Sequence, residues 1–143
     1  MERIKRAKIA VIGDYCLDAY WDVDTAFSER SLETGLDTHP VRSQRYSPGG
    51  AGNVLANLVS LGAAEAHALG VVGDDPFGQY LRGALEKSGG RIEGLVTQGQ
   101  NWQTHVYAKP HLSDEEGNRF DFGCFNQMDE KTERALVEAR DSC

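Results

Sequence analysis

Cysteine and positive charge are both scarce in this chain of 143 residues. Its 3 cysteines contain no Cys-x-x-Cys pair, and an odd count excludes a fully paired disulfide framework, so we expect reduced thiols in a cytoplasmic protein. Lys and Arg number 15 against 22 Asp and Glu, and the net charge of −7 argues against nucleic-acid binding. The apolar run at residues 9–12 is far shorter than the roughly 18–20 residues that cross a bilayer, so we expect no membrane span or signal peptide.

Several common site patterns are also missing. The 4 histidines and the cysteines do not combine into the spacing of a zinc site. The histidines are His39, His67, His105 and His111. No Ser-His-Asp arrangement can be read, and the P-loop pattern Gly-x-x-x-x-Gly-Lys-Ser/Thr does not occur. We therefore predict no metal site in this chain and no phosphate-cradling P-loop.

The apolar periodicity that is present predicts an α/β fold. The predicted strands are residues 8–13, 19–24, 41–46, 66–72, 92–96, 104–108 and 119–122, and the predicted helices are residues 52–62, 76–88 and 129–140. Alternation of strands and helices implies a parallel sheet with right-handed crossovers. The additional strands and a hairpin around the polar segment 113–118 imply a small second layer. The last helical pattern has no Gly or Pro stop signal, so we expect the chain to continue in a longer protein.

Two stretches carry candidate binding residues. Residues 48–53 read PGGAGN before a helix, and Gly49 and Gly50 would let a ligand approach the backbone while Asn53 donates and accepts hydrogen bonds. The simpler interpretation is a tight strand-to-helix turn. Asp14 and Asp18 follow the first strand, where ligands bind in open α/β sheets. Each could equally be a solvated loop carboxylate or a helix N-cap.

Taken together, these motifs resemble the amino-terminal half of a PfkB/ribokinase-family carbohydrate kinase. The motifs are VIGDYCLD at residues 11–18, PGGAGNV at 48–54, SLGA at 60–63 and GVVGDDPFG at 70–78. The resemblance covers about residues 8–130 and looks closest to the heptose-phosphate kinase branch. It implies a ribokinase-like fold, namely a partial parallel sheet flanked by helices plus a small β lid.

The resemblance also implies roles for the candidate residues. Asp18 would bond sugar hydroxyls, with Asp14, Gly49, Gly50 and Asn53 as the surrounding shell of a sugar or sugar-phosphate substrate. Strands near residues 19–24, 41–46, 104–108 and 119–122 would form the lid, which in this family often pairs with the lid of another subunit. We therefore expect a homodimer or larger homo-oligomer.

The catalytic part of the family pattern is not in this sequence. The Gly-Ala-Gly-Asp motif, which supplies the base and the anion hole, belongs to the carboxy-terminal half, as do the sites for ATP and magnesium. Residues 1–143 are thus expected to be a sugar-binding and lid half that holds no cofactor and is inactive alone. A non-catalytic sugar-binding or dimerisation module is the alternative, and a nucleotide-binding α/β domain of another kind is a third hypothesis.

Overall fold

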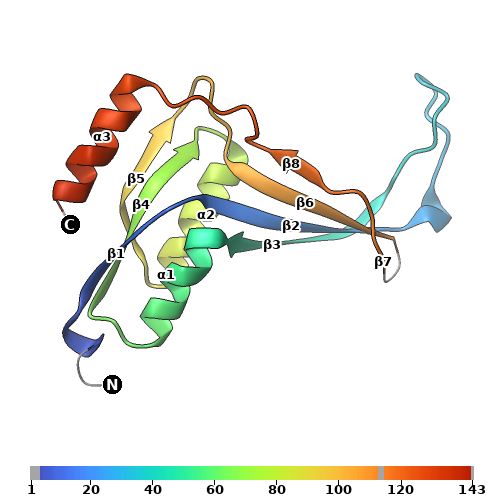
Figure 1. Ribbon diagram of the computed structural model, residues 1–143. Helices are drawn as coiled ribbons and strands as arrows, with labels where there is room; N and C mark the ends of the chain where they lie inside the picture. Colours follow the sequence, from blue (N-terminus) through green and yellow to red (C-terminus); the bar gives the residue numbers. More distant parts are fainter. Residues whose placement is uncertain (1–3, 113–114, 143) are drawn as a thin grey trace.

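The computed structural model describes residues 4–112 and 115–142, and these form two sheets that meet at a helical layer. The first sheet is parallel, in the order β1-β4-β5. Its strands are β1 (Lys8–Ile12), β4 (Glu65–Gly73) and β5 (Arg91–Gln98). Helices α1 (Gly50–Ser60) and α2 (Pro76–Lys87) cover one face and α3 (Glu130–Asp141) covers the other (Figure 1). The predicted α/β architecture is confirmed.

The second sheet projects away from the helices (Figure 1), and we call it the outer sheet. It consists of β2 (Tyr15–Val23), β3 (Val41–Gly49), β6 (His105–Leu112), β7 (Glu115–Glu116) and β8 (Phe120–Phe122). The order is β3-β2-β6-β7, with β8 also pairing with β6. Only β2 and β6 run parallel, and the other neighbours are antiparallel.

Most predicted elements lie where the sequence placed them, but the outer sheet differs in several places. β3 runs to Gly49 rather than to residue 46, and β6 runs from His105 to Leu112 rather than over residues 104–108. The second strand begins at Tyr15 rather than at residue 19, because Cys16 already pairs with Gly49 on β3 and with His105 on β6. The predicted hairpin is present between β6 and β8, but its polar tip also contains the short strand β7. Residues 113–114 of that tip lie outside the described residues.

One apolar core joins the two sheets. Leu17 and Val106 come from the outer sheet, Leu55 and Leu81 from the two covering helices, and Val72 from the parallel sheet, and all five are fully buried. Burying such side chains contributes about 1.5–3 kcal/mol each. The inner end of the outer sheet is therefore fixed to the body of the molecule.

Local capping sets where the helices begin. Asp75 precedes Pro76, and its side chain accepts a hydrogen bond from the Gly78 amide at 2.8 Å, so α2 starts at the turn after β4. Asp129 accepts from the Thr132 amide at 2.7 Å and starts α3 in the same way. No described helix combines the length and the apolar character of a membrane span.

The outer sheet has two chemically different faces because side chains alternate along a strand. On β2, Leu17 and Ala19 point into the core, whereas Asp18 and Tyr20 lie on the opposite face. Lys109 on β6 belongs to this second face, which we call the polar face. The polar face carries Asp18, one of the candidate binding residues.

Candidate functional site

Four of the predicted site residues meet where the outer sheet joins the parallel sheet. Asp14 lies in the connection between β1 and β2, Gly49 ends β3, and Gly50 begins α1. The Asp14 carbonyl accepts a hydrogen bond from the Ala51 amide at 3.1 Å, which ties the β1–β2 connection to the first turn of α1. Asp18 lies on β2 rather than in a loop. The junction therefore brings together residues that are up to 36 positions apart in sequence.

Both glycines at this junction are required by space or by backbone conformation. A Cβ atom on Gly49 would lie 2.9 Å from Asp18 Oδ2 and 2.9 Å from the Cys16 thiol. Gly50 has a φ of +46°, and a Cβ there would lie 2.8 Å from the Asp14 carbonyl oxygen. The tight-turn interpretation of PGGAGN is correct for Gly50, and the close approach to Asp18 adds a second reason for Gly49.

Asn53 lies in the first helical turn of α1, further from the junction than the glycines. Asn53 is exposed, and its side-chain amide makes no hydrogen bond to any of the described residues. Its side chain is therefore available to an external ligand. Nothing in the geometry brings it into direct contact with Asp18.

The carboxylate of Asp18 has a partner that the sequence did not reveal. Lys109 Nζ donates a hydrogen bond to Asp18 Oδ1 at 2.7 Å, and the two side chains are 18% and 22% exposed. The bond to Asp18 is the main cause of a pKa for Lys109 above its ordinary value. The alternation of residues 104–108 was the available signal, since extending that strand to residue 112 places Lys109 beside β2.

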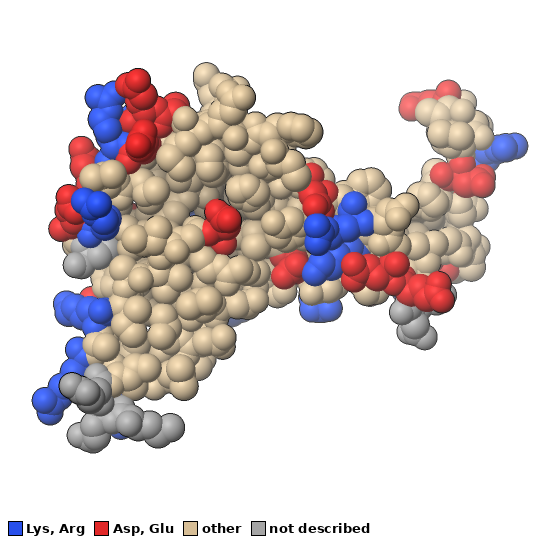
Figure 2. All heavy atoms as spheres, in the orientation of Figure 1, with Lys and Arg blue, Asp and Glu red and all other residues tan. Residues whose placement is uncertain are grey.

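Aromatic rings and further cations continue the polar face outward from Asp18. The Arg45 guanidinium lies 4.1 Å from the centroid of the Tyr20 ring, and Lys109 Nζ lies 4.9 Å from the same centroid. Arg119 lies over the Tyr107 ring at 4.6 Å. Figure 2 shows basic and acidic side chains gathered along the outer sheet.

The charges on this face are not equally balanced. Lys109 is paired with Asp18, and Arg119 binds both carboxylate oxygens of Asp121, at 2.6 and 2.7 Å. Arg45 forms no salt bridge with any of the described carboxylates, and its guanidinium lies over the Tyr20 ring. Arg45 is therefore a cation that an anionic ligand group can bind without displacing a protein partner.

The buried thiol at the base of the site is unsuited to nucleophilic chemistry. Cys16 is 6% exposed and lies against Gly49. Burial is the largest cause of its raised pKa, and the nearby carboxylates Asp18 and Asp14 raise it further. Cys16 and Cys124 are free thiols, as predicted, and Cys143 lies outside the described residues. Within residues 4–112 and 115–142 no cluster of His, Cys, Asp and Glu side chains could hold a metal ion.

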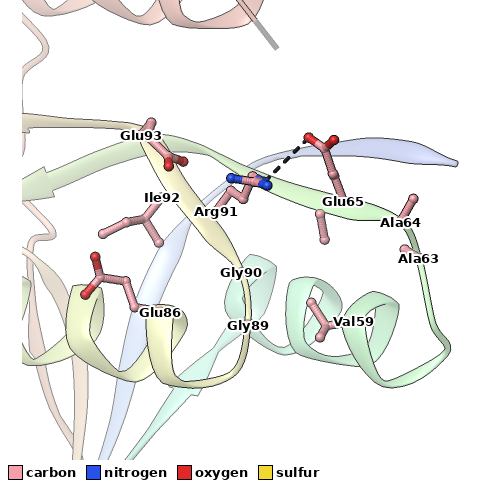
Figure 3. A pocket seen from close by; sticks show the side chains of 11 residues that line it. Val59, Ala63, Ala64, Glu65, Glu86, Gly89, Gly90, Arg91, Ile92 and Glu93 are labelled. Carbon is pink, nitrogen blue, oxygen red and sulfur yellow. Dashed lines mark ion pairs between the residues drawn. The ribbon is translucent and has the colours of Figure 1, made fainter.

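A cavity lies at the other end of the parallel sheet, where β4 and β5 begin (Figure 3). It measures about 400 Å³, and Glu65 and Arg91 on its wall form an ion pair at 3.5 Å. Glu65 also binds Lys8 at 2.8 Å and His67 at 2.9 Å, and the Lys8 bond is the main cause of its lowered pKa. Glu65 thus joins the amino ends of β1, β4 and β5, which is a structural role away from Asp18.

Comparison with known proteins agrees with the fold and the motifs. The family model described as pfkB family carbohydrate kinase matches residues 6–143. The bifunctional protein HldE of Hydrogenovibrio crunogenus is 37% identical over 89 residues, which are 62% of this chain and 18% of that protein. The chain spans only about a fifth of the length of the curated relatives it matches.

Solved structures show the same architecture. An uncharacterised sugar kinase from Pyrococcus horikoshii, solved with ATP, has a TM-score of 0.57 at 25% identity, covering 91% of this chain and 40% of that one. Ribokinase from Cryptococcus neoformans, solved with ADP, has a TM-score of 0.60 at 17% identity, covering 80% of this chain and 34% of that one. The fold is therefore that of ribokinase-like sugar kinases, and the chain belongs to the pfkB family of carbohydrate kinases.

Proposed function

We propose that this chain binds the sugar or sugar-phosphate acceptor of an ATP-dependent kinase reaction. The observation that carries the proposal is the position of the Asp18 carboxylate. It accepts a hydrogen bond from Lys109 and lies so close to Gly49 that a side chain at residue 49 would clash with it. One carboxylate oxygen is engaged by Lys109, and the other can accept hydrogen bonds from acceptor hydroxyls. Asp14 supplies a further polar group at the same junction, and Asn53 supplies one from the first turn of α1.

The unpaired cation on the polar face supports a phosphorylated acceptor. Arg45 has no carboxylate partner among the described residues, and the Tyr20 ring lies between it and Lys109. Guanidinium groups bind phosphate through two parallel hydrogen bonds. In this proposal Asp18 orients the sugar, Arg45 holds the phosphate, and the outer sheet covers the acceptor as a lid.

Phosphoryl transfer needs groups beyond those that this chain contributes. The reaction depends on positioning and on stabilising the charge of the transferred group, and the sequence has no Gly-Ala-Gly-Asp motif to supply a base and an anion hole. ATP and magnesium would therefore be held by a carboxy-terminal part of a longer kinase. The alternative of a non-catalytic sugar-binding module shares the Asp18 site and differs only in lacking that part.

Calorimetric titration tests the binding step. The chain is titrated with a panel of sugars and their phosphate esters, and we expect saturable binding that is tightest for a phosphorylated member. Asp18→Asn should weaken binding by about 1–3 kcal/mol, the range for a hydrogen bond to a charged group. Glu138→Gln removes one charge from the exposed surface of α3 and should leave binding unchanged. Equal binding by the Asp18→Asn variant contradicts the proposal.

A further inference from the structure

The polar face of the outer sheet continues outward from Asp18 as rows of side chains across β3, β2 and β6. The first row beyond Asp18 consists of Arg45, Tyr20 and Lys109. The outermost row consists of Ser43, Asp22 and His111. Asp22 follows Asp18 by four residues on β2, which separates the two positions by about 13 Å at ~3.3 Å per residue. The outermost row is therefore a separate location from the candidate acceptor site.

A β-bulge in the outermost row redirects one side chain. The register of β2 against β3 shifts between Asp22 and Val23, so that Arg42 is an extra residue on β3. Strict alternation would direct Arg42 to the face opposite Ser43. Instead, Arg42 and Asp22 line one cavity, and Arg42 Nε donates a hydrogen bond to Asp24 Oδ2 at 3.0 Å. Bulges that redirect a side chain in this way are common beside active sites.

We call the cavity beside the bulge the outer cavity. It measures about 280 Å³ and is lined by Asp22, Val23, Asp24, Arg42 and His111. The Asp22 carboxylate accepts a hydrogen bond from the Ser43 hydroxyl and forms no salt bridge with any of the described cations. His111 Nε2 is buried, makes no hydrogen bond to the described residues and lies 3.9 Å from Glu116 Oε2. A buried polar atom without a partner is unfavourable, and a ligand hydroxyl would satisfy it.

The lining of the outer cavity limits the chemistry of its ligand. Val23 is its one apolar residue, so an apolar ligand would have little to pack against. Asp22, Asp24 and the nearby Glu116 repel anions. Arg42 is already bound to Asp24 and does not offset that repulsion. Within the part of the chain that the structure describes, no group of side chains could hold a metal ion.

A neutral ligand that both donates and accepts hydrogen bonds remains. An ammonium group only donates, so it could not use the N–H groups of Arg42. A hydroxyl donates to the carboxylate of Asp22 and accepts from Arg42, and it can bond to the ring nitrogen of His111 in either sense. Several hydroxyls on one rigid ring would use all three groups at once.

We propose that the outer cavity binds one neutral saccharide unit, as a second site on the polar face beyond the acceptor site around Asp18. Its volume of about 280 Å³ has room for a single sugar ring. A small shift of Glu116 would let a hydroxyl reach His111 Nε2, since β7 is joined to β6 by only two residue pairs. The carboxylates disfavour a phosphate ester in this cavity, so the two sites would select different ligands.

Amide NMR titration with unphosphorylated sugars tests this site. The probes are glucose, galactose, mannose, maltose and lactose, and we expect at least one to cause saturable shifts of the Val23, Arg42 and His111 amides. Asp22→Asn and His111→Phe should each require at least about tenfold more sugar, because each removes a hydrogen-bonding group. Phenylalanine keeps a ring against Tyr20, and the isosteric Asp22→Asn provides the test should His111→Phe fail to fold.

Two further variants separate this site from its surroundings. Glu115→Gln removes a charge from β7 on the face opposite Glu116 and should leave the titration unchanged. Asp18→Asn alters the acceptor site, and the shifts that a monosaccharide causes at the outer cavity should persist in it with the same midpoint. The outer cavity therefore stands or falls independently of the proposed acceptor site.

The disaccharides show whether the saccharide unit is joined to the acceptor. Equal midpoints at the Asp18 and His111 amides would show one ligand that spans both sites, whereas different midpoints would show a separate sugar molecule. Sulfate and spermidine are titrated as an anion and an amine. The proposal is overturned if no sugar shifts the outer-cavity amides, if Asp22→Asn leaves the titration unchanged, or if sulfate or spermidine binds there more tightly than every sugar.

Discussion

Lys109 Nζ lies 2.7 Å from Asp18 Oδ1, so two residues 91 positions apart in sequence form one charged pair at the junction of the two sheets. The parallel pairing of β2 and β6 makes this contact possible, because it places Tyr20 directly opposite Lys109. Asp18 precedes Tyr20 by two residues on β2, so its side chain lies on the same face of the sheet. The pair presents a positioned carboxylate at the candidate site.

The pair should stabilise the fold by a measurable amount. Lys109→Met leaves the Asp18 carboxylate without its partner at a position that is only 22% exposed. We expect the free energy of unfolding to fall by about 1–2 kcal/mol, as for a charged hydrogen bond that solvent partly screens. Urea unfolding of Lys109→Met, Asp18→Asn and the double variant gives the coupling energy. Strictly additive effects would show that the two side chains do not interact.

The raised pKa of Lys109 predicts a loss of stability in alkali. Its bond to Asp18 favours the ammonium form in the folded state, so the stabilisation is complete below the unfolded pKa of about 10.4 and is lost as the pH rises through the higher folded value. The free energy of unfolding should therefore decrease more steeply above this pH in the unmodified chain than in Lys109→Met. Parallel curves for the two proteins would contradict the assignment.

Acid should destabilise the fold through Glu65, at the end of the parallel sheet away from Asp18. The pKa of Glu65 is lowered, first by Lys8 and then by His67, so its stabilising effect is present above the unfolded value of about 4.3 and is lost as the pH falls through the folded value. Glu65→Gln should flatten the acid side of a plot of Tm against pH. Glu86→Gln is the matched control, because Glu86 lines the same cavity and forms no salt bridge with the described residues.

Gly49 should tolerate no side chain. In Gly49→Ala the new methyl group would meet Asp18 Oδ2 and the Cys16 thiol at 2.9 Å, so the carboxylate must move. We expect a loss of about 1–3 kcal/mol of stability from overpacking, together with weaker acceptor binding. Gly83→Ala is the control: nothing lies near that position in α2, and the change should stabilise the helix by about 0.5–1 kcal/mol.

The chain by itself should not phosphorylate sugars. It contains no Gly-Ala-Gly-Asp motif, and phosphoryl transfer without an anion hole or a positioned base is slow. A coupled assay with ATP, magnesium and the acceptor panel should match a blank without protein. Saturable turnover that co-purifies with the chain through successive columns would show that the catalytic groups lie within these residues.

Local patterns were sufficient to predict the parallel sheet and its helices. These elements are indicated by residues that are adjacent in the sequence. The signals are short apolar runs for the strands, Asp75 before Pro76 for α2, and Gly49 and Gly50 at the start of α1. The outer sheet was harder, because its pairing depends on contacts between distant strands. Its second strand was predicted to start at residue 19, yet Tyr15 and Cys16 already belong to β2 since β3 and β6 pair with them.

In the candidate site too, residues in motifs could be predicted and residues outside them could not. Asp18, Gly49 and Gly50 belong to motifs, and the structure places Gly49 close to Asp18. Lys109 and Arg45 carry no motif, and each reaches the site only through strand register.

Amide NMR during titration with a sugar phosphate tests acceptor binding at this junction most directly. We predict saturable chemical-shift changes centred on the amides of Asp18, Gly49, Gly50 and Asn53, with none in the cavity beside Glu65. In Asp18→Asn the same changes should need about 10- to 100-fold more ligand, as the loss of a charged hydrogen bond implies. Shifts centred elsewhere, or a titration unaffected by Asp18→Asn, would contradict the account.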